Sequence, residues 1–293
     1  MRPFCSVPLF LLILFTQINS SAQDIPGATT FHIHSSHTSF PDTGRAKGHI
    51  YENKLYTAKE HYTDSTVLII APQNLDAKKT VDLVFWFHGW GNNVDSAAAR
   101  YELTKQFIAS KRNAVLVLAE TARNAPDSYG GKLENMGVFK GLVADVTEAL
   151  KLKKIIPQNC TTGHVLLGGH SGAYRVMARI IKNGQMPIDE TMLFDALYGE
   201  TNIFVDWIKA DTRHRFINLY TDHGGTFDES KAMSKLLDDD DILNLQVEEK
   251  ALVPAQLRGH PIIFIHSLKA HNDIVSPDNF RLMLENEPFL KKL

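Results

Sequence analysis

Short hydrophobic runs recur along most of the chain, and polar segments of helical length separate them. Each run is almost wholly apolar and does not alternate with polar positions, a pattern typical of strands buried on both faces of a parallel sheet. The pattern therefore predicts a sheet that is covered on both sides. The predicted strands are residues 67–70, 81–87, 114–118, 164–167, 191–194, 216–220 and 262–265.

The segments between these runs place apolar residues at helical spacing. We predict helices over residues 96–110, 136–152, 173–182 and 228–237, with Asp95 as N-cap of the first. Trp207 lies in a further amphipathic segment. Strands alternating with helices are typical of an α/β fold with a doubly wound, mostly parallel sheet.

The start of the chain departs from this alternation. Residues 23–64 are polar and rich in His and Tyr, so we predict a β-rich N-terminal extension there and one catalytic α/β domain over residues 65–293. No Pro-, Gly- or Ser-rich linker divides the rest of the chain, and its length suits one large domain.

Residues 1–22 have the layout of a secretory signal peptide. Arg2 precedes an apolar stretch at residues 7–15, and the small residues Ser20 and Ala22 stand at the −3 and −1 positions of a cleavage site. An uncleaved anchor is the alternative, but the apolar stretch is well short of the roughly 20 residues that span a bilayer. We therefore expect export to the periplasm or outside the cell, and no stable membrane span after cleavage.

Composition narrows the class of protein. The 293 residues are 44% hydrophobic and 22% charged with a net charge of −2, so we expect a globular protein that does not bind nucleic acid. Without its leader the chain keeps one cysteine, Cys160, which we expect to be a buried small hydrophobe. His32, His34 and His37 lack the partners of a zinc site, and we expect no metal.

The most informative motif follows the strand at 164–167. Gly169-His170-Ser171-Gly172-Ala173 matches G-x-S-x-G except for its last residue, and it connects a predicted strand to a predicted helix. This context fits a nucleophile elbow, in which small residues let strand and helix approach closely around a strained serine. The alternative, a phosphate-binding loop, lacks the lysine that such loops carry.

A second motif ends the strand at 81–87. His88-Gly89-Trp90 opens a turn rich in Gly and Asn before a predicted helix. A serine hydrolase needs two backbone N–H groups that face the developing oxyanion, one from the residue after the nucleophile and one from an earlier strand's loop. We expect the N–H groups of Gly172 and Trp90 in this role, and a structural role for His88.

Together these motifs resemble the α/β-hydrolase superfamily over about residues 65 to 285. The resemblance implies the order nucleophile, acid, histidine, and no metal or organic cofactor. The histidine follows the last strand in this order. We therefore expect His271 as the base; His266 belongs to the strand end, and His260 precedes the strand.

Two aspartates compete for the role of the acid. Asp195 ends the strand at 191–194, and Asp222 ends the next one; most α/β-hydrolases place the acid after the second. An aspartate at the end of so apolar a strand is costly without a partner, and an imidazolium would be a suitable one. We therefore choose Asp195 and keep Asp222 as the alternative; a structural salt bridge would be the other use of Asp195.

These observations predict an exported serine hydrolase that cleaves a small or polymeric carboxylic ester through a Ser171-His271-Asp195 triad and an acyl-enzyme. A serine peptidase or amidase could use the same triad. A non-catalytic binding protein with this fold is a further alternative, and it predicts that His271 lies far from Ser171. The sequence does not determine the substrate or the oligomeric state.

Overall fold

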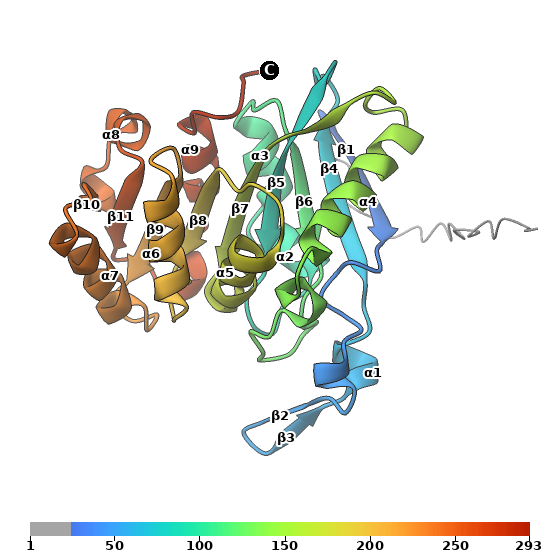
Figure 1. Cartoon of the computed structure of the whole chain (residues 1–293), viewed down its shortest axis with the longest axis horizontal. Helices are drawn as coiled ribbons and strands as arrows, with labels where there is room; N and C mark the ends of the chain where they lie inside the picture. Colours follow the sequence, from blue (N-terminus) through green and yellow to red (C-terminus); the bar gives the residue numbers. More distant parts are fainter. Residues whose placement is uncertain (1–24) are drawn as a thin grey trace, which may run out of the picture.

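The structure, a computed structural model, describes residues 25–293 (Figure 1). The predicted signal peptide lies outside the described residues. Within residues 25–293, nine strands form one sheet in the order β1-β4-β6-β5-β7-β8-β9-β11-β10. These strands are β1 (Ala28–His34), β4 (Thr66–Pro72), β5 (Thr80–Phe87), β6 (Val115–Ala119), β7 (Thr161–His170), β8 (Glu190–Phe194), β9 (Arg215–Thr221), β10 (Leu245–Glu248) and β11 (Ile262–Ser267).

The sheet is mostly parallel, as the apolar runs predict. β1 pairs with β4 and β4 with β6 in antiparallel fashion, while the pairs from β6 through β5 to β10 are parallel. All seven predicted strands are present. β10 was not predicted, because its residues alternate between half-buried and exposed at the edge of the sheet and form no apolar run.

Helices cover both faces of the sheet (Figure 1). One hydrophobic cluster joins a face of the sheet to α4 (Val138–Leu152), α5 (Tyr174–Asn183), α6 (Thr201–Ala210) and α7 (Phe227–Asp239). A second cluster joins the other face to α2 (Val94–Arg100), α3 (Leu103–Ala109), α8 (Pro254–Gly259) and α9 (Asn279–Glu285). In β5, Phe85 belongs to the first cluster and Trp86 to the second, which explains why the strand is apolar throughout. The doubly wound fold is confirmed.

One predicted helix is wrong in detail. Residues 96–110 form two helices, α2 and α3, because Tyr101 caps the first and Glu102 takes a left-handed φ of 47°. The N-cap is Asn93, whose side chain accepts the Ser96 N–H at 3.0 Å, and not Asp95. The break turns Tyr101 inward, where its hydroxyl reaches His170.

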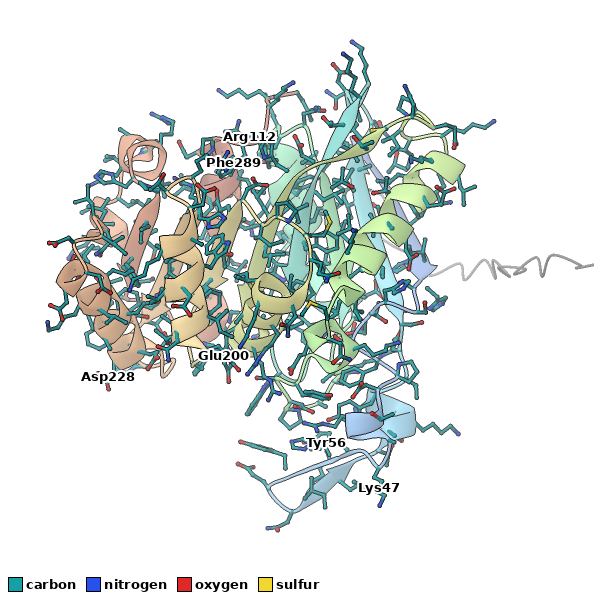
Figure 2. All side chains as sticks on the ribbon, viewed as in Figure 1. Lys47, Tyr56, Arg112, Glu200, Asp228 and Phe289 are labelled. Atoms are coloured by element: carbon teal, nitrogen blue, oxygen red, sulfur yellow. The ribbon has the colours of Figure 1, made fainter. Side chains whose placement is uncertain are left out.

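The segment predicted as an N-terminal extension contains two kinds of structure. β1 is an edge strand of the main sheet, whereas β2 (His49–Tyr51) and β3 (Lys54–Tyr56) form a separate hairpin next to α1 (Ala58–His61). The hairpin projects from one end of the molecule, where Figure 2 labels Lys47 and Tyr56. The Tyr51 ring packs edge-on against Trp90, with centroids 5.3 Å apart, so the hairpin reaches the loop after β5.

The structure also shows the surroundings of the cysteine and of the histidines near the start of the chain. Cys160 is free and buried, as expected. His32 bonds to Asp95 and His37 to Asp145, and within residues 25–293 no group of three or more His, Cys, Asp or Glu side chains is arranged to hold a metal ion. In the same range, no helix has both the length and the apolar character needed to cross a membrane.

Candidate active site

The residues that carry the predicted chemistry gather at one edge of the sheet. Ser171 follows β7, Asp195 follows β8, and His271 lies in the turn after β11. Gly89 follows β5, the neighbour of β7. Because parallel strands present their carboxyl ends at a common edge, segments up to 182 positions apart in the sequence meet there.

The turn at Ser171 has the strained geometry of a nucleophile elbow. Ser171 takes a φ of 57°, in the left-handed region that L residues rarely occupy. A Cβ on Gly169 would lie 2.6 Å from Ala173 Cβ and 2.6 Å from Met177 Sδ. The close crossing of β7 and α5 therefore requires glycine at 169 and tolerates alanine at 173. This explains the departure from G-x-S-x-G.

Ser171, His271 and Asp195 form one hydrogen-bonded row. The Ser171 Oγ lies 3.0 Å from His271 Nε2, and His271 Nδ1 lies 2.6 Å from Asp195 Oδ2. A carboxylate can only accept, so Nδ1 carries a proton and donates it, while Nε2 accepts from the serine hydroxyl. This is the tautomer in which the imidazole can take the serine proton.

Asp195 is fully buried, yet the surroundings favour its charged form. Its carboxylate accepts the Thr221 N–H at 3.1 Å, the Thr221 hydroxyl at 2.8 Å and the Thr226 hydroxyl. Burial raises the pKa of this carboxyl, but the hydrogen bonds from His271, Thr226 and Thr221 outweigh it and hold the pKa below its usual value. A Cβ at Gly224 would lie 1.8 Å from Asp195 Oδ2, so only glycine fits there.

Asp222, the alternative acid, and His266 and His260, the other histidines near the last strand, make hydrogen bonds elsewhere. Asp222 bonds to His266, with 2.8 Å between Oδ1 and Nε2, and Glu248 holds the other ring nitrogen of His266 at 2.9 Å. Burial lowers the pKa of His266, but the two carboxylates raise it above its usual value. His260 bonds to the Gln256 carbonyl. In the described structure none of these residues makes a side-chain hydrogen bond to Ser171 or His271.

His170 makes a hydrogen bond to the backbone of His271, and the sequence did not predict this contact. Its Nε2 lies 2.9 Å from the His271 carbonyl oxygen, and its Nδ1 lies 3.1 Å from the Tyr101 hydroxyl. The carbonyl must accept, so Nε2–H donates and Nδ1 accepts from Tyr101, which defines a neutral ring. Burial, with a smaller effect of His271, lowers the pKa of His170 to about 4. His170 therefore stays neutral and ties the turn of His271 to the elbow.

The loop after β5 lies directly against the nucleophile. A Cβ at Gly89 would lie 2.6 Å from Ser171 Cβ, so only glycine allows this approach. The Trp90 indole donates to the Ser128 hydroxyl at 2.7 Å, and its Cδ1 would lie 2.5 Å from a Cβ at Gly172. The two residues expected to supply oxyanion donors are therefore neighbours in space.

His88 holds this loop through a buried ion pair, in keeping with its expected structural role. Its Nε2 lies 2.6 Å from Glu120 Oε1, and its Nδ1 lies 2.8 Å from the Gly89 carbonyl oxygen. Burial lowers the pKa of His88, but Glu120 and the Gly89 carbonyl raise it above its usual value. The Gly89 carbonyl and the Trp90 N–H belong to one peptide group, so the bond from His88 fixes the direction of that N–H.

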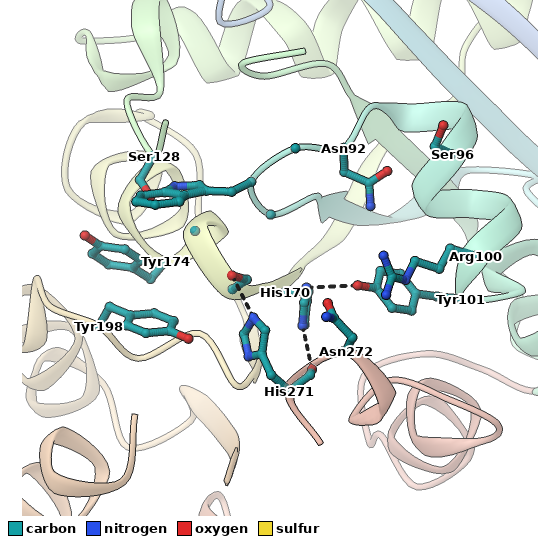
Figure 3. A pocket seen from close by; sticks show the side chains of 15 residues that line it. Asn92, Ser96, Arg100, Tyr101, Ser128, His170, Tyr174, Tyr198, His271 and Asn272 are labelled. Atoms are coloured by element: carbon teal, nitrogen blue, oxygen red, sulfur yellow. Dashed lines mark hydrogen bonds between the residues drawn. The ribbon is translucent and has the colours of Figure 1, made fainter. Parts of the chain in front are cut away.

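A cavity of about 750 Å³ opens above Ser171 (Figure 3). The sequence motifs and position rules pointed to six of its lining residues: Gly89, Trp90, His170, Ser171, Gly172 and His271. The others come from separate loops and helix ends and form no motif: Asn92, Ser96, Arg100, Tyr101, Ser128, Tyr174, Tyr198 and Asn272 are among them. Only the folded chain brings them together.

This chain is similar to known proteins in its fold and not in its sequence. No family model and no curated protein matches the sequence. Among solved structures, an S-formylglutathione hydrolase from Staphylococcus aureus aligns over 88% of this chain and 94% of its own, with a TM-score of 0.50 and 10% identity. A ferulic acid esterase aligns over 83% and 91%, with a TM-score of 0.50 and 9% identity. With the strand order and the position of the elbow, these similarities show that the chain has the α/β-hydrolase fold.

Proposed function

We propose that this protein is a serine hydrolase that cleaves carboxylic esters through an acyl-enzyme. One observation carries the proposal: the hydrogen-bonded row from Asp195 through His271 to Ser171 ends at a cavity large enough for a small-molecule ester. The esterases and hydrolases of similar fold support the reaction class by analogy alone.

In this mechanism Ser171 attacks the ester carbonyl while His271 Nε2 takes its proton. Asp195, bonded to Nδ1, stabilises the imidazolium that forms and keeps its orientation. The imidazolium then protonates the leaving alcohol. A water molecule, deprotonated by the same nitrogen, attacks the acyl-enzyme and frees Ser171.

The negative charge on the carbonyl oxygen needs donors that are already in place. The N–H groups of Gly172 and Trp90 are our candidates, because both residues line the cavity next to Ser171. The hydrogen bond from His88 to the Gly89 carbonyl fixes the direction of the Trp90 N–H before the substrate binds. Donors fixed in advance do not have to reorganise during the reaction, which is the main source of their effect.

The non-catalytic alternative predicts that His271 lies far from Ser171, and the two side chains are 3.0 Å apart instead. A peptidase or amidase would use the same atoms. Esters matched with amides of the same acyl group separate these activities, because only the leaving group changes between the two substrates.

The first experiment is labelling of Ser171. We expect a fluorophosphonate to modify the folded protein at Ser171, as mapped by mass spectrometry, and Ser171→Ala to abolish the adduct. Ser36→Ala, which removes an exposed serine hydroxyl outside the cavity lining, is the control and should still react. Folded wild-type protein that stays unlabelled would contradict the proposal.

Export is part of the proposal and needs its own test. The leader at residues 1–22 supports cleavage after Ala22. We expect protein recovered outside the cytoplasm to begin at Gln23 when its N-terminus is sequenced. Protein that stays in the cytoplasm with Met1 in place would contradict it.

A further inference from the structure

Arg100 stands out among the residues that line the cavity. It is the last residue of α2, and its side chain is exposed at the cavity. Among the described residues it makes no ion pair and no side-chain hydrogen bond, and its guanidinium carbon lies 5.7 Å from the centre of the Tyr101 ring. Its five N–H donors therefore face the cavity without a protein acceptor.

The neighbours of Arg100 are polar and include a second free donor. The Asn92 Oδ1 accepts the Asn93 N–H at 3.0 Å, so its amide nitrogen points the other way and remains a donor. The side chains of Ser96 and Asn272 complete this part of the lining (Figure 3). A guanidinium and an amide donor that line the same cavity suit a carboxylate.

The carboxylates near the cavity either pair with a histidine or lie outside the cavity lining. Asp195 is buried behind His271 and bonded to it. Asp95 pairs with His32 at 2.8 Å, and exposed Asp273 does not line the cavity. In the described structure Arg100 is thus the one permanently charged side chain of the lining, so the lining carries a positive charge although the whole chain has a net charge of −2.

The opposite side of the cavity is aromatic. Figure 3 shows Tyr174 and Tyr198 on one side of His271, and Arg100 with Asn92 on the other. The two tyrosine rings lie 6.0 Å apart. A substrate bound above Ser171 therefore meets two aromatic rings, tilted by 47° to each other, at one end and a cation at the other.

We propose that the cavity binds esters that carry a carboxylate, and that Arg100 and Asn92 hold this group while Ser171 attacks the ester carbonyl. The inference rests on the proposed esterase function and names its substrate class. Arg100 acts here as a specificity-determining residue that contacts the substrate at a distance from the bond that breaks.

Matched pairs of esters test the proposal. In 4-acetoxybenzoate the charge lies on the alcohol side, and 4-acetoxybenzamide is its neutral counterpart. Monomethyl glutarate and methyl glutaramate form the pair with the charge on the acyl side. We expect wild-type kcat/KM to favour the carboxylate in at least one pair by about tenfold or more over the ratio found in Arg100→Gln, which corresponds to about 1.4 kcal/mol.

Two control variants show whether the carboxylate preference depends on the charge and the shape of the Arg100 side chain. Lys182→Gln removes one positive charge from an exposed position of α5 outside the cavity lining and should leave the preference unchanged. Arg100→Lys should restore part of it, because the charge returns without the planar fork. Equal carboxylate preference in wild type and Arg100→Gln for both pairs would overturn the proposal.

Binding to a protein that cannot turn over separates this inference from the proposed function. Titration calorimetry on Ser171→Ala, which leaves the esters intact, should show tighter binding of 4-acetoxybenzoate or monomethyl glutarate than of 4-acetoxybenzamide or methyl glutaramate. Adding Arg100→Gln should remove the difference. If wild type cleaves no ester and escapes the fluorophosphonate, the esterase proposal fails, yet this measurement still decides the role of Arg100. Carboxylates that bind no better than the amides would refute it.

Discussion

Asp195 and Asp222 each follow a buried strand of the same sheet, yet only Asp195 contacts His271. Asp195 is buried and accepts four hydrogen bonds, while Asp222 lies near the surface with His266. The same side chain at equivalent positions of neighbouring strands therefore has two uses. The hydrogen-bond partners of each aspartate decide which of the two uses it has.

We expect Asp195→Asn to lower kcat by about 10⁴-fold, because an amide can stabilise the wrong tautomer of His271 and cannot balance the imidazolium. Asp222→Asn is the matched control, since it makes the same change one strand away, and its kcat should stay within a few-fold of wild type. Steady-state kinetics on a neutral ester measures both. The reverse order of effects would assign the acid to Asp222.

His170 predicts a pH dependence of stability. Its pKa is about 4 in the folded protein and 6.5 in an exposed ring, so between these values the unfolded chain binds a proton that the folded protein does not. The free energy of unfolding should therefore fall as the pH drops from 6.5 to about 4, by up to about 1.4 kcal/mol per pH unit from this group. Above pH 6.5 its contribution is constant.

His170→Gln removes this proton and can still bond to Tyr101 and the His271 carbonyl. Urea unfolding of both proteins at several pH values should give a flatter curve for the variant between pH 6.5 and 4. Parallel curves for the two proteins would show that His170 is not held neutral.

At the scale of elements, the site depends on how closely β7 and α5 cross. Gly169 in the strand and Ala173 at the start of the helix touch, and there is room for one Cβ between them. The G-x-S-x-G pattern describes this packing in sequence form. A motif that departs from it in one residue can therefore keep the same backbone.

We expect Gly169→Ala to destabilise the protein by about 1–3 kcal/mol, because its Cβ would overpack against Ala173 and Met177. Adding Ala173→Gly to the same protein removes one of the two contacts and should recover part of the loss. Urea unfolding measures both changes. A single variant as stable as wild type would mean that the crossing can widen without cost.

At the scale of the whole molecule, structural and chemical charges occupy opposite ends of the same strand. Glu190 begins β8 and pairs with Arg215 at the start of β9, with 2.9 Å between Oε2 and Nε, and both are buried. Asp195 follows the other end of β8. Stability at one edge of the sheet can therefore change without altering the geometry of the site at the other edge.

Burial raises the pKa of Glu190 to about 8, although Arg215 lowers it, so the pair is largely charged at pH 9. At that pH, Glu190→Gln leaves Arg215 as a buried charge without its partner and should cost about 3–5 kcal/mol of unfolding free energy. The double variant Glu190→Met with Arg215→Met removes both charges and should recover most of it. Urea unfolding reports these differences, while kcat/KM of the folded fraction should match wild type in both. A loss of activity in folded protein would contradict the separation of the two edges.

The local pattern determined much of the fold. Apolar runs predicted seven strands of the sheet, because a strand covered on both faces must be apolar throughout. The elbow motif selected Ser171, the position after the last strand selected His271, and the cost of an aspartate at the end of an apolar strand favoured Asp195. Their catalytic roles stay predictions that labelling and kinetics test.

Tertiary structure alone decided the rest. The break between α2 and α3, the neutral ring of His170, the bond from His88 to Gly89 and the exposure of Arg100 all depend on contacts between distant segments. Hydrophobic periodicity reports which side of an element faces the core and carries no information about polar partners far away in the sequence. The cavity above Ser171 is built from such partners, so its chemistry becomes visible only when the chain is folded.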